Sequence, residues 1–208
     1  MSATIDYYFA GSSPFTYLGH WAIRDVATKH GAKLDYKPVN PMGVWKESGS
    51  VPLPQRSAVR QRYRFLELQR IAEMRGLPLT LKPAYFPVDS TLADCCTIVL
   101  QQSGQDPADY MDRIFTAVWV DQANIADESV ISDRLDQSGF DAAEVIANAK
   151  ASSIQAKRDA YTEEAATRDA VGVPAFVLNG EVFWGQDRIE FIDHALASGR
   201  PPYQPAEL

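Results

Sequence analysis

The stretch Ile5-Asp-Tyr-Tyr-Phe-Ala-Gly-Ser-Ser-Pro-Phe-Thr-Tyr17 decides how the chain begins to fold. Its aromatic run Tyr7–Phe9 favours a β-strand, and Gly11 ends that strand. Ser13 stands at the N-cap position of a helix and Pro14 at the first helical position, where a missing backbone N–H costs nothing. The stretch therefore predicts a strand, a turn and a helix whose free N–H groups lie beside the Ser13 hydroxyl. Such a helix start favours a phosphate, a carboxylate or a thiolate, although a plain N-cap explains the same residues.

Length, composition and charge narrow the class of protein. The 208 residues suit one domain, or one domain with a large insertion, and the 46% hydrophobic and 23% charged content is that of a soluble globular chain. No apolar run approaches the roughly 18 residues of a membrane span, so we expect no membrane partner. The net charge of −7 argues against nucleic acid as the main partner. The first residues show no basic region followed by an apolar one, so we expect a cytoplasmic protein.

The cysteines and histidines give no sign of metal or redox chemistry. Cys95 and Cys96 are adjacent in a predicted helix and far from any partner at metal-binding spacing, so we expect both to be buried, inert thiols. The histidines His20, His30 and His194 fall on predicted helices, and we interpret them as structural or solvated. The sequence therefore predicts no metal site.

A βαβ unit occupies the first part of the chain. Apolar residues recur at helical spacing after Ser13, and Gly31 marks the expected end of that helix. Leu34 and Tyr36 then alternate with polar neighbours and predict a second strand. The glycines and prolines of residues 40–54 predict a loop.

Residues 55–171 follow a helical pattern, which is too much helix for a simple alternation of strands and helices. The breaks in this pattern fall near Gly76, Gly104, Gly139 and Gly172. The first helical segment is basic and carries Arg56, Arg60, Arg62, Arg64, Arg70 and Arg75. These arginines predict either a solvated helix face or a patch that attracts an anionic ligand.

The last section returns to strands. Residues 173–178 and 181–184 predict two strands joined by Asn179-Gly180, the strongest short hairpin signal. Asp187 then predicts the N-cap of a final helix, with Glu190 three residues on. Two further caps are predicted in the helical section, at Ser90 and at Ser152 with Gln155.

Together these segments resemble the thioredoxin fold interrupted by a helical domain, as in the DsbA-like branch of that superfamily. The resemblance implies an α/β fold in which residues 1–54 and 172–208 form the thioredoxin-like domain and residues 55–171 form a large all-helical insertion. Redox members carry Cys-X-X-Cys before the first helix, but here Ser13-Pro14-Phe15-Thr16 stands at that place. Without a cysteine in this turn, the chain cannot shuttle a disulfide there.

Three motifs resemble the family of 2-hydroxychromene-2-carboxylate isomerases, glutathione-dependent enzymes related to kappa-class glutathione transferases. The motifs are Ser13-Pro14-Phe15-Thr16-Tyr17, Gly172-Val173-Pro174 and Phe183-Trp184-Gly185-Gln186-Asp187-Arg188. The resemblance covers nearly the whole chain, from Thr4 to Ser198. Gln186 departs from the small polar residue expected at its position, and residues 40–54 match the family poorly.

The resemblance implies glutathione as cofactor and a set of residues that bind it. Ser13 would hold the glutathione sulfur as a thiolate and act as the catalytic residue. Pro174, in a cis peptide bond with Val173, would let the Val173 backbone pair with the cysteinyl part of the tripeptide. Gln186 and Asp187 would receive the γ-glutamyl end, with Asp187 facing its ammonium group. A plain N-cap remains the open alternative for Asp187.

The reaction implied is a cis-trans isomerisation that converts a 2-hydroxychromene-2-carboxylate-type hemiketal to a trans-hydroxybenzylidenepyruvate, in aromatic hydrocarbon catabolism. Such a small aromatic carboxylate needs an apolar slot and at least one cation. The candidate walls are Phe15, Trp45, Tyr85, Phe86 and Trp119, and the candidate cations are Arg56, Arg60 and Lys46.

Two rival functions remain open. A kappa-class-like glutathione transferase would use the same glutathione site but release a thioether, whereas the isomerase returns glutathione unchanged. A non-catalytic thioredoxin-like module would capture extended peptides in the groove beside Pro174. The apolar surface of the helical section also allows a homodimer.

Overall fold

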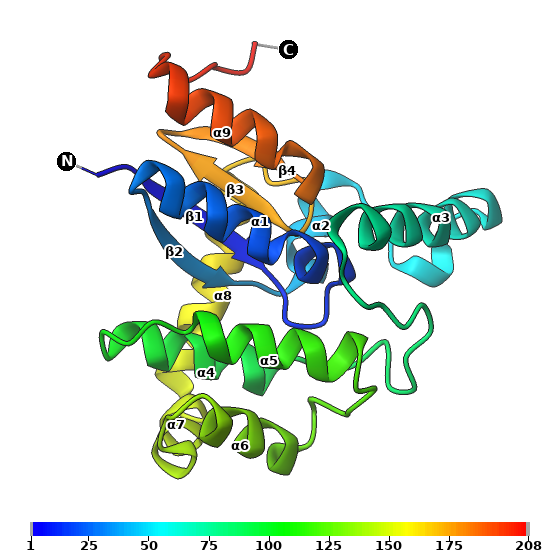
Figure 1. Ribbon diagram of the computed structural model, residues 1–208, viewed down its shortest axis with the longest axis vertical. Coiled ribbons are helices and arrows are strands. Elements are labelled where there is room, and N and C mark those ends of the chain that lie inside the picture. The colour runs from blue at the N-terminus through cyan, green and yellow to red at the C-terminus, as the bar shows by residue number, and fades with distance from the viewer. Residues whose placement is uncertain (1, 207–208) are drawn as a thin grey trace.

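The computed structural model describes residues 2–206 and has a four-stranded mixed sheet at its centre (Figure 1). The strands lie in the order β2-β1-β3-β4, with β1 parallel to β2 and antiparallel to β3, and with β3 antiparallel to β4. Their bounds are β1 (Thr4–Phe9), β2 (Lys33–Pro38), β3 (Ala175–Leu178) and β4 (Glu181–Trp184). The predicted strands are therefore confirmed, with β3 beginning two residues later than expected.

Helix α1 (Pro14–His30) connects the two parallel strands and covers one face of the sheet together with α9 (Ile189–Ser198) (Figure 1). A parallel pair needs such a crossover because the chain has to return to the same end of the sheet. As predicted, α1 ends at Gly31, whose φ of 61° lies in the left-handed region that glycine tolerates.

The chain between β2 and β3 is mainly helical, as the sequence predicts. The helices are α2 (Pro41–Ser48), α3 (Ala58–Arg75), α4 (Thr91–Gln102), α5 (Ala108–Trp119), α6 (Glu128–Gln137), α7 (Ala142–Ala149) and α8 (Ser152–Thr167). Figure 1 shows α4 to α7 below the sheet, α8 rising from them behind it, and α3 projecting to the side. Within residues 2–206, no helix combines the length and the apolar character that a membrane crossing requires.

Alternation along β1 sends its side chains into two separate cores. Ile5, Tyr7 and Phe9 pack on the face covered by α1 and α9, in a cluster that includes Phe176 of β3. Tyr8 points to the opposite face, where it packs with side chains of β3, α2, α4 and α8. These four side chains of β1 are almost completely buried. Helices therefore cover both faces of the sheet.

The predictions for the cysteines and for His20 are confirmed. Cys95 and Cys96 are both free and buried on α4, and burial raises the pKa of their thiols to about 11 and about 12. His20 is fully buried on α1, with its Nδ1 3.3 Å from the Tyr7 hydroxyl. These side chains belong to the core.

The expectation of a loop over residues 40–54 is wrong, because α2 and a 3₁₀ turn, η1 (Leu53–Gln55), lie there. Asn40 caps α2 by accepting the N–H of Met42 at 3.0 Å, and its own N–H donates to Thr162 Oγ1 of α8 at 2.9 Å. A Cβ on Gly43 would come within 2.5 Å of Thr162 Cγ2, so the two helices touch at a glycine. Packing on α8 thus stabilises a helix of 8 residues, which is too short to be stable alone.

Two predicted helix caps are also wrong. Asp187 lies inside a 3₁₀ turn, η2 (Gln186–Arg188), where its carboxylate pairs with Arg188, and α9 begins afterwards without a side-chain cap. The extended residue before α8 is Ala151, so Ser152 already lies inside the first turn of that helix. Ser90 does stand at the N-cap position of α4, but its hydroxyl makes no cap hydrogen bond.

Candidate active site

Ser13 stands at the N-terminus of α1, on the wall of a cavity of about 590 Å³. Its Oγ accepts the N–H of Thr16 at 3.2 Å, and Pro14 occupies the first turn of the helix, as predicted. The Ser13 N–H donates to the Ala10 carbonyl at 3.0 Å, which closes the turn between β1 and α1. Because the Oγ accepts from Thr16, its own proton is free to be donated into the cavity.

A buried ion pair holds the turn that precedes Ser13. The Gly11 N–H donates to Asp94 Oδ1 of α4 at 2.9 Å, and Arg158 of α8 and the Ser90 hydroxyl each donate to Asp94 Oδ2 at 2.9 Å. Asp94 is 1% exposed and Arg158 8%. A Cβ on Gly11 would lie 2.9 Å from Asp94 Oδ1, so the backbone approaches this carboxylate closely. The helical section thus fixes the turn on which Ser13 stands.

The predicted cis peptide bond between Val173 and Pro174 is present. Val173 lines the cavity, and Pro174 is buried behind it. The preceding residue, Gly172, is bracketed by two indoles: a Cβ there would lie 3.2 Å from Trp45 Nε1 and 3.1 Å from Trp184 Nε1. The two indoles therefore pack closely on the Gly172 backbone at this edge of the cavity.

Gln186 lines the cavity, but its side chain is already bonded. It is 5% exposed, and its Oε1 accepts two hydrogen bonds from Arg75, from Nη2 at 2.7 Å and from Nε at 3.2 Å. Helix α1 also packs closely on Gln186, since a Cβ on Gly19 would lie 2.7 Å from Gln186 Cβ. Arg75, which the sequence placed only in a basic patch, therefore supports the turn that carries Asp187.

Two carboxylates line the cavity, Asp187 of η2 and Glu67 of α3. Burial and the charge of Asp187 raise the pKa of Glu67, against the opposing effect of Arg70. An ammonium group placed between the two carboxylates would relieve this repulsion. Sequence reasoning missed Glu67, because nothing local shows that a residue of α3 lies beside a turn 120 positions away; the basic patch around it was the only signal.

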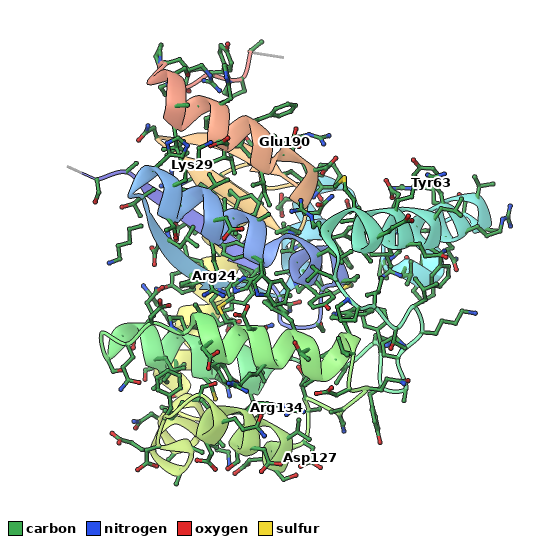
Figure 2. All side chains as sticks on the ribbon, viewed as in Figure 1. Arg24, Lys29, Tyr63, Asp127, Arg134 and Glu190 are labelled. Atoms are coloured by element: carbon green, nitrogen blue, oxygen red, sulfur yellow. The ribbon has the colours of Figure 1, made fainter. Side chains whose placement is uncertain are left out.

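The structure brings most of the predicted substrate residues to the cavity. Phe15, Trp45, Phe86, Arg56 and Arg60 line it, as does the half-exposed Tyr63, which Figure 2 labels on α3.

Three other candidates lie elsewhere. Tyr85 is 52% exposed and is not among the lining residues, because the connector turns its side chain to solvent while Phe86 points inward. Trp119 is completely buried in the core, with its ring centroid 4.9 Å from that of Phe86. Lys46 is exposed on α2 and does not line the cavity either.

Arg64 is a lining residue that sequence reasoning did not single out. Its guanidinium carbon lies 5.5 Å from the ring centroid of Phe86 and 6.0 Å from that of Phe15. Arg64 is only 8% exposed, and burial, together with the charge of Arg56, lowers its pKa to about 10. The basic helix is therefore not simply a solvated face, because Arg64 turns inward among aromatic rings.

Comparison with known proteins shows the family of this chain. Residues 4–197 match the DsbA-like thioredoxin domain. Two relatives named 2-hydroxychromene-2-carboxylate isomerase are similar over nearly their whole length: one from Sphingobium xenophagum is 25% identical over 94% of this chain and 99% of its own, and one from Pseudomonas putida is 28% identical over 98% of each.

Solved structures agree with this placement. A 2-hydroxychromene-2-carboxylate isomerase superposes with a TM-score of 0.82 at 25% identity, covering 94% of this chain and 95% of its own. The cytosolic disulfide reductase DsbM from Pseudomonas aeruginosa has a TM-score of 0.68 at 19% identity, covering 94% of this chain and 99% of its own, and shares the fold. The chain belongs to the DsbA-like thioredoxin domain family.

Proposed function

We propose that the chain is a glutathione-dependent cis-trans isomerase that converts 2-hydroxychromene-2-carboxylate-type hemiketals to trans-hydroxybenzylidenepyruvates. The observation that carries the proposal is the Ser13 hydroxyl at a helix N-terminus, on the wall of a cavity lined by aromatic rings and arginines. The similarity to isomerases over 92–98% of the chain supports it.

The residues of the cavity fit a bound glutathione in two respects. The partly exposed Val173 lines the cavity beside the Trp45 and Trp184 indoles, where a peptide can pair with its backbone as an added strand. Glu67 and Asp187 both line the cavity, and two carboxylates favour a cation such as the γ-glutamyl ammonium, which would share Asp187 with Arg188. We assign Ser13, Val173, Pro174 and Asp187 to the glutathione site, with Gln186 as the buried support of its turn.

Ser13 stabilises a thiolate without a histidine base. Lowering a thiol pKa from about 8.5 by two units takes about 2.7 kcal/mol of preference for the anion. A helix N-terminus supplies about 0.3 to 2 kcal/mol, and a hydroxyl hydrogen bond to a charged sulfur about 1.5 to 3 kcal/mol. These two contributions together are sufficient, and the Ser13 proton is available because Thr16 already donates to the oxygen.

Glutathione held at Ser13 would supply a nucleophilic thiolate, whose reversible addition to the unsaturated carbon would let the hemiketal ring open and the former double bond rotate, with the thiolate expelled unchanged as the double bond forms again. Ser13 orients the sulfur and holds its charge. The aromatic side chains of the cavity exclude water and bind the ring of the substrate.

Calorimetric titration with reduced glutathione tests the cofactor site, run on the wild type, on Ser13→Ala and on Ser12→Ala. Ser12 also lines the cavity but does not cap α1, so it is the matched control. Ultraviolet difference spectra of the same mixtures measure the thiolate form of the bound ligand. We expect thiolate absorbance in the wild type and in Ser12→Ala, and its loss in Ser13→Ala. No binding of glutathione to the wild type would refute the proposal.

Product analysis tests the reaction. With a chromene carboxylate as substrate, we expect the trans isomer and full recovery of glutathione. A stable thioether in its place would make the protein a transferase of the kappa-class type.

A further inference from the structure

Arg64 is a buried cation for which the described residues provide no anion. It is 8% exposed, and its pKa responds to burial and to the charge of Arg56, which is another cation, with no contribution from a carboxylate. The groups around its guanidinium are the rings of Phe15, Phe65 and Phe86, at 6.0, 5.9 and 5.5 Å. Aromatic faces attract a cation but replace its hydration only in part. A ligand that carries a negative charge would therefore be strongly favoured at this point.

The other arginines of the cavity are occupied or solvated. Arg56 donates to the Val51 carbonyl at 2.9 Å and stacks on Trp45. Arg188 is paired with Asp187. Arg60 and Arg70 are exposed, and water screens their charge. Among the described cations that line the cavity, Arg64 combines a buried charge with the lack of a protein acceptor.

Arg64 lies on the Ser13 side of the cavity, one helical turn before Glu67 on α3. Two of the aromatic rings around its guanidinium come from Phe15, two residues after Ser13 in the first turn of α1, and from Phe86 in the connector before α4. Two of the groups assigned to glutathione, Val173 and Asp187, come from the β3 and β4 side of the cavity. An aromatic carboxylate needs an apolar slot and a cation together, and these coincide at Arg64, close to Ser13.

We propose that Arg64 binds the carboxylate of the aromatic substrate, with Phe15 and Phe86 as the walls for its ring. This inference rests on the proposed isomerase function. Arg64 then decides that the cavity accepts anionic aromatic substrates and rejects neutral ones, because its planar guanidinium can bond both oxygens of a carboxylate.

The test compares the substrate acid with its neutral methyl ester in four proteins: the wild type, Arg64→Gln, Arg64→Lys and Arg62→Gln. Arg62 is exposed on the same helix and does not line the cavity, so Arg62→Gln is the control. We expect the ratio of kcat/KM for acid over ester to fall by about 10- to 150-fold in Arg64→Gln, chiefly through KM. Arg64→Lys should retain more of the ratio than Arg64→Gln, since lysine keeps the positive charge but cannot donate two parallel hydrogen bonds to a carboxylate.

Glutathione titration of the same variants separates this inference from the proposed function. We expect the glutathione Kd of Arg64→Gln to stay within twofold of the wild type, which also shows that the variant is folded. A loss of glutathione affinity in both Arg64 variants would overturn the inference, because Arg64 would then serve the cofactor. An unchanged acid-to-ester ratio in Arg64→Gln would overturn it as well.

A failure of the proposed function leaves the inference testable. If the wild type does not bind glutathione, direct titration with a trans-benzylidenepyruvate still measures the carboxylate site. Tighter binding to the wild type than to Arg64→Gln would support the inference, and equal binding would overturn it.

Discussion

Arg75, the last residue of α3, and Gln186, the first residue of η2, are joined by three hydrogen bonds across 111 positions of sequence. Two go from the guanidinium to Gln186 Oε1, and the third goes from Nη2 to the Gln186 carbonyl at 3.2 Å. The helical section thereby holds the turn that presents Asp187 to the cavity. The Gln186 side-chain oxygen is therefore bonded within the protein.

Arg75→Met should weaken glutathione binding while the protein stays folded. The substitution leaves the buried Gln186 oxygen without a donor, which costs about 1 to 3 kcal/mol and loosens η2. We expect a three- to tenfold higher Kd in calorimetry. The double variant Arg75→Met/Gln186→Leu should recover part of the stability, since both polar partners are then removed. Strict additivity of the two single changes would contradict the coupling.

Asp94→Asn should be strongly destabilising. Removing one partner of a buried ion pair leaves Arg158 uncompensated, and we expect a loss of about 3 to 5 kcal/mol in the free energy of unfolding. The matched control is Asp109→Asn, whose ion pair with Arg113 at 3.1 Å is exposed and should be worth less than about 1 kcal/mol. Urea unfolding followed by circular dichroism measures both. Equal losses in the two variants would show that the Asp94 pair does not hold the Gly11 turn.

Gly43→Ala should separate α2 from α8 and disturb Trp45. The new methyl group would lie 2.5 Å from Thr162 Cγ2, and overpacking of this kind costs about 1 to 3 kcal/mol. Adding Thr162→Ser removes the opposing methyl group and keeps the hydroxyl that accepts from Asn40. We therefore expect the second substitution to restore both the melting temperature and the Trp fluorescence. Persistence of the defect in the double variant would argue against this contact.

Stability should fall as the pH drops below about 6.5, through His20. Burial and the nearby Arg24 charge lower the pKa of His20 to about 3, and the carboxylate of Asp112 beside it is already paired with Arg24 at 2.5 Å. The unfolded chain therefore takes up a proton that the folded chain refuses, which lowers the free energy of unfolding by about 2 kcal/mol between pH 7 and pH 5. The stabilisation is present above the unfolded pKa and lost as the pH falls towards the folded one.

Urea unfolding of His20→Gln at both pH values checks this origin. The variant has no titratable group at position 20, so its stability should change less between pH 7 and pH 5 than that of the wild type. The comparison uses the difference between the two pH values, because the substitution itself alters packing. The same pH dependence in both proteins would assign it to other groups.

Several features that depend on neighbouring residues could be predicted from the sequence alone. The Ser13 cap, the helix end at Gly31 and the Asn179-Gly180 turn are fixed by backbone conformation and by hydrogen bonds within a few positions. The strands and the thioredoxin-like order followed from these signals and from the motifs. At these three positions local chemistry and the final fold agree, whereas the local cap signals at Asp187 and Ser152 were overridden.

Other features depend on how distant segments of the chain pack together. Helix α2 exists because Gly43 lets it pack on α8, and Arg64 became a buried cation because α3 lies against the first turn of α1. The side-chain oxygen of Gln186 accepts a hydrogen bond from Arg75, which lies 111 positions away in the sequence. Each depends on desolvation and on contacts between distant segments, whose free energies exceed local propensities but leave no mark in the neighbouring sequence.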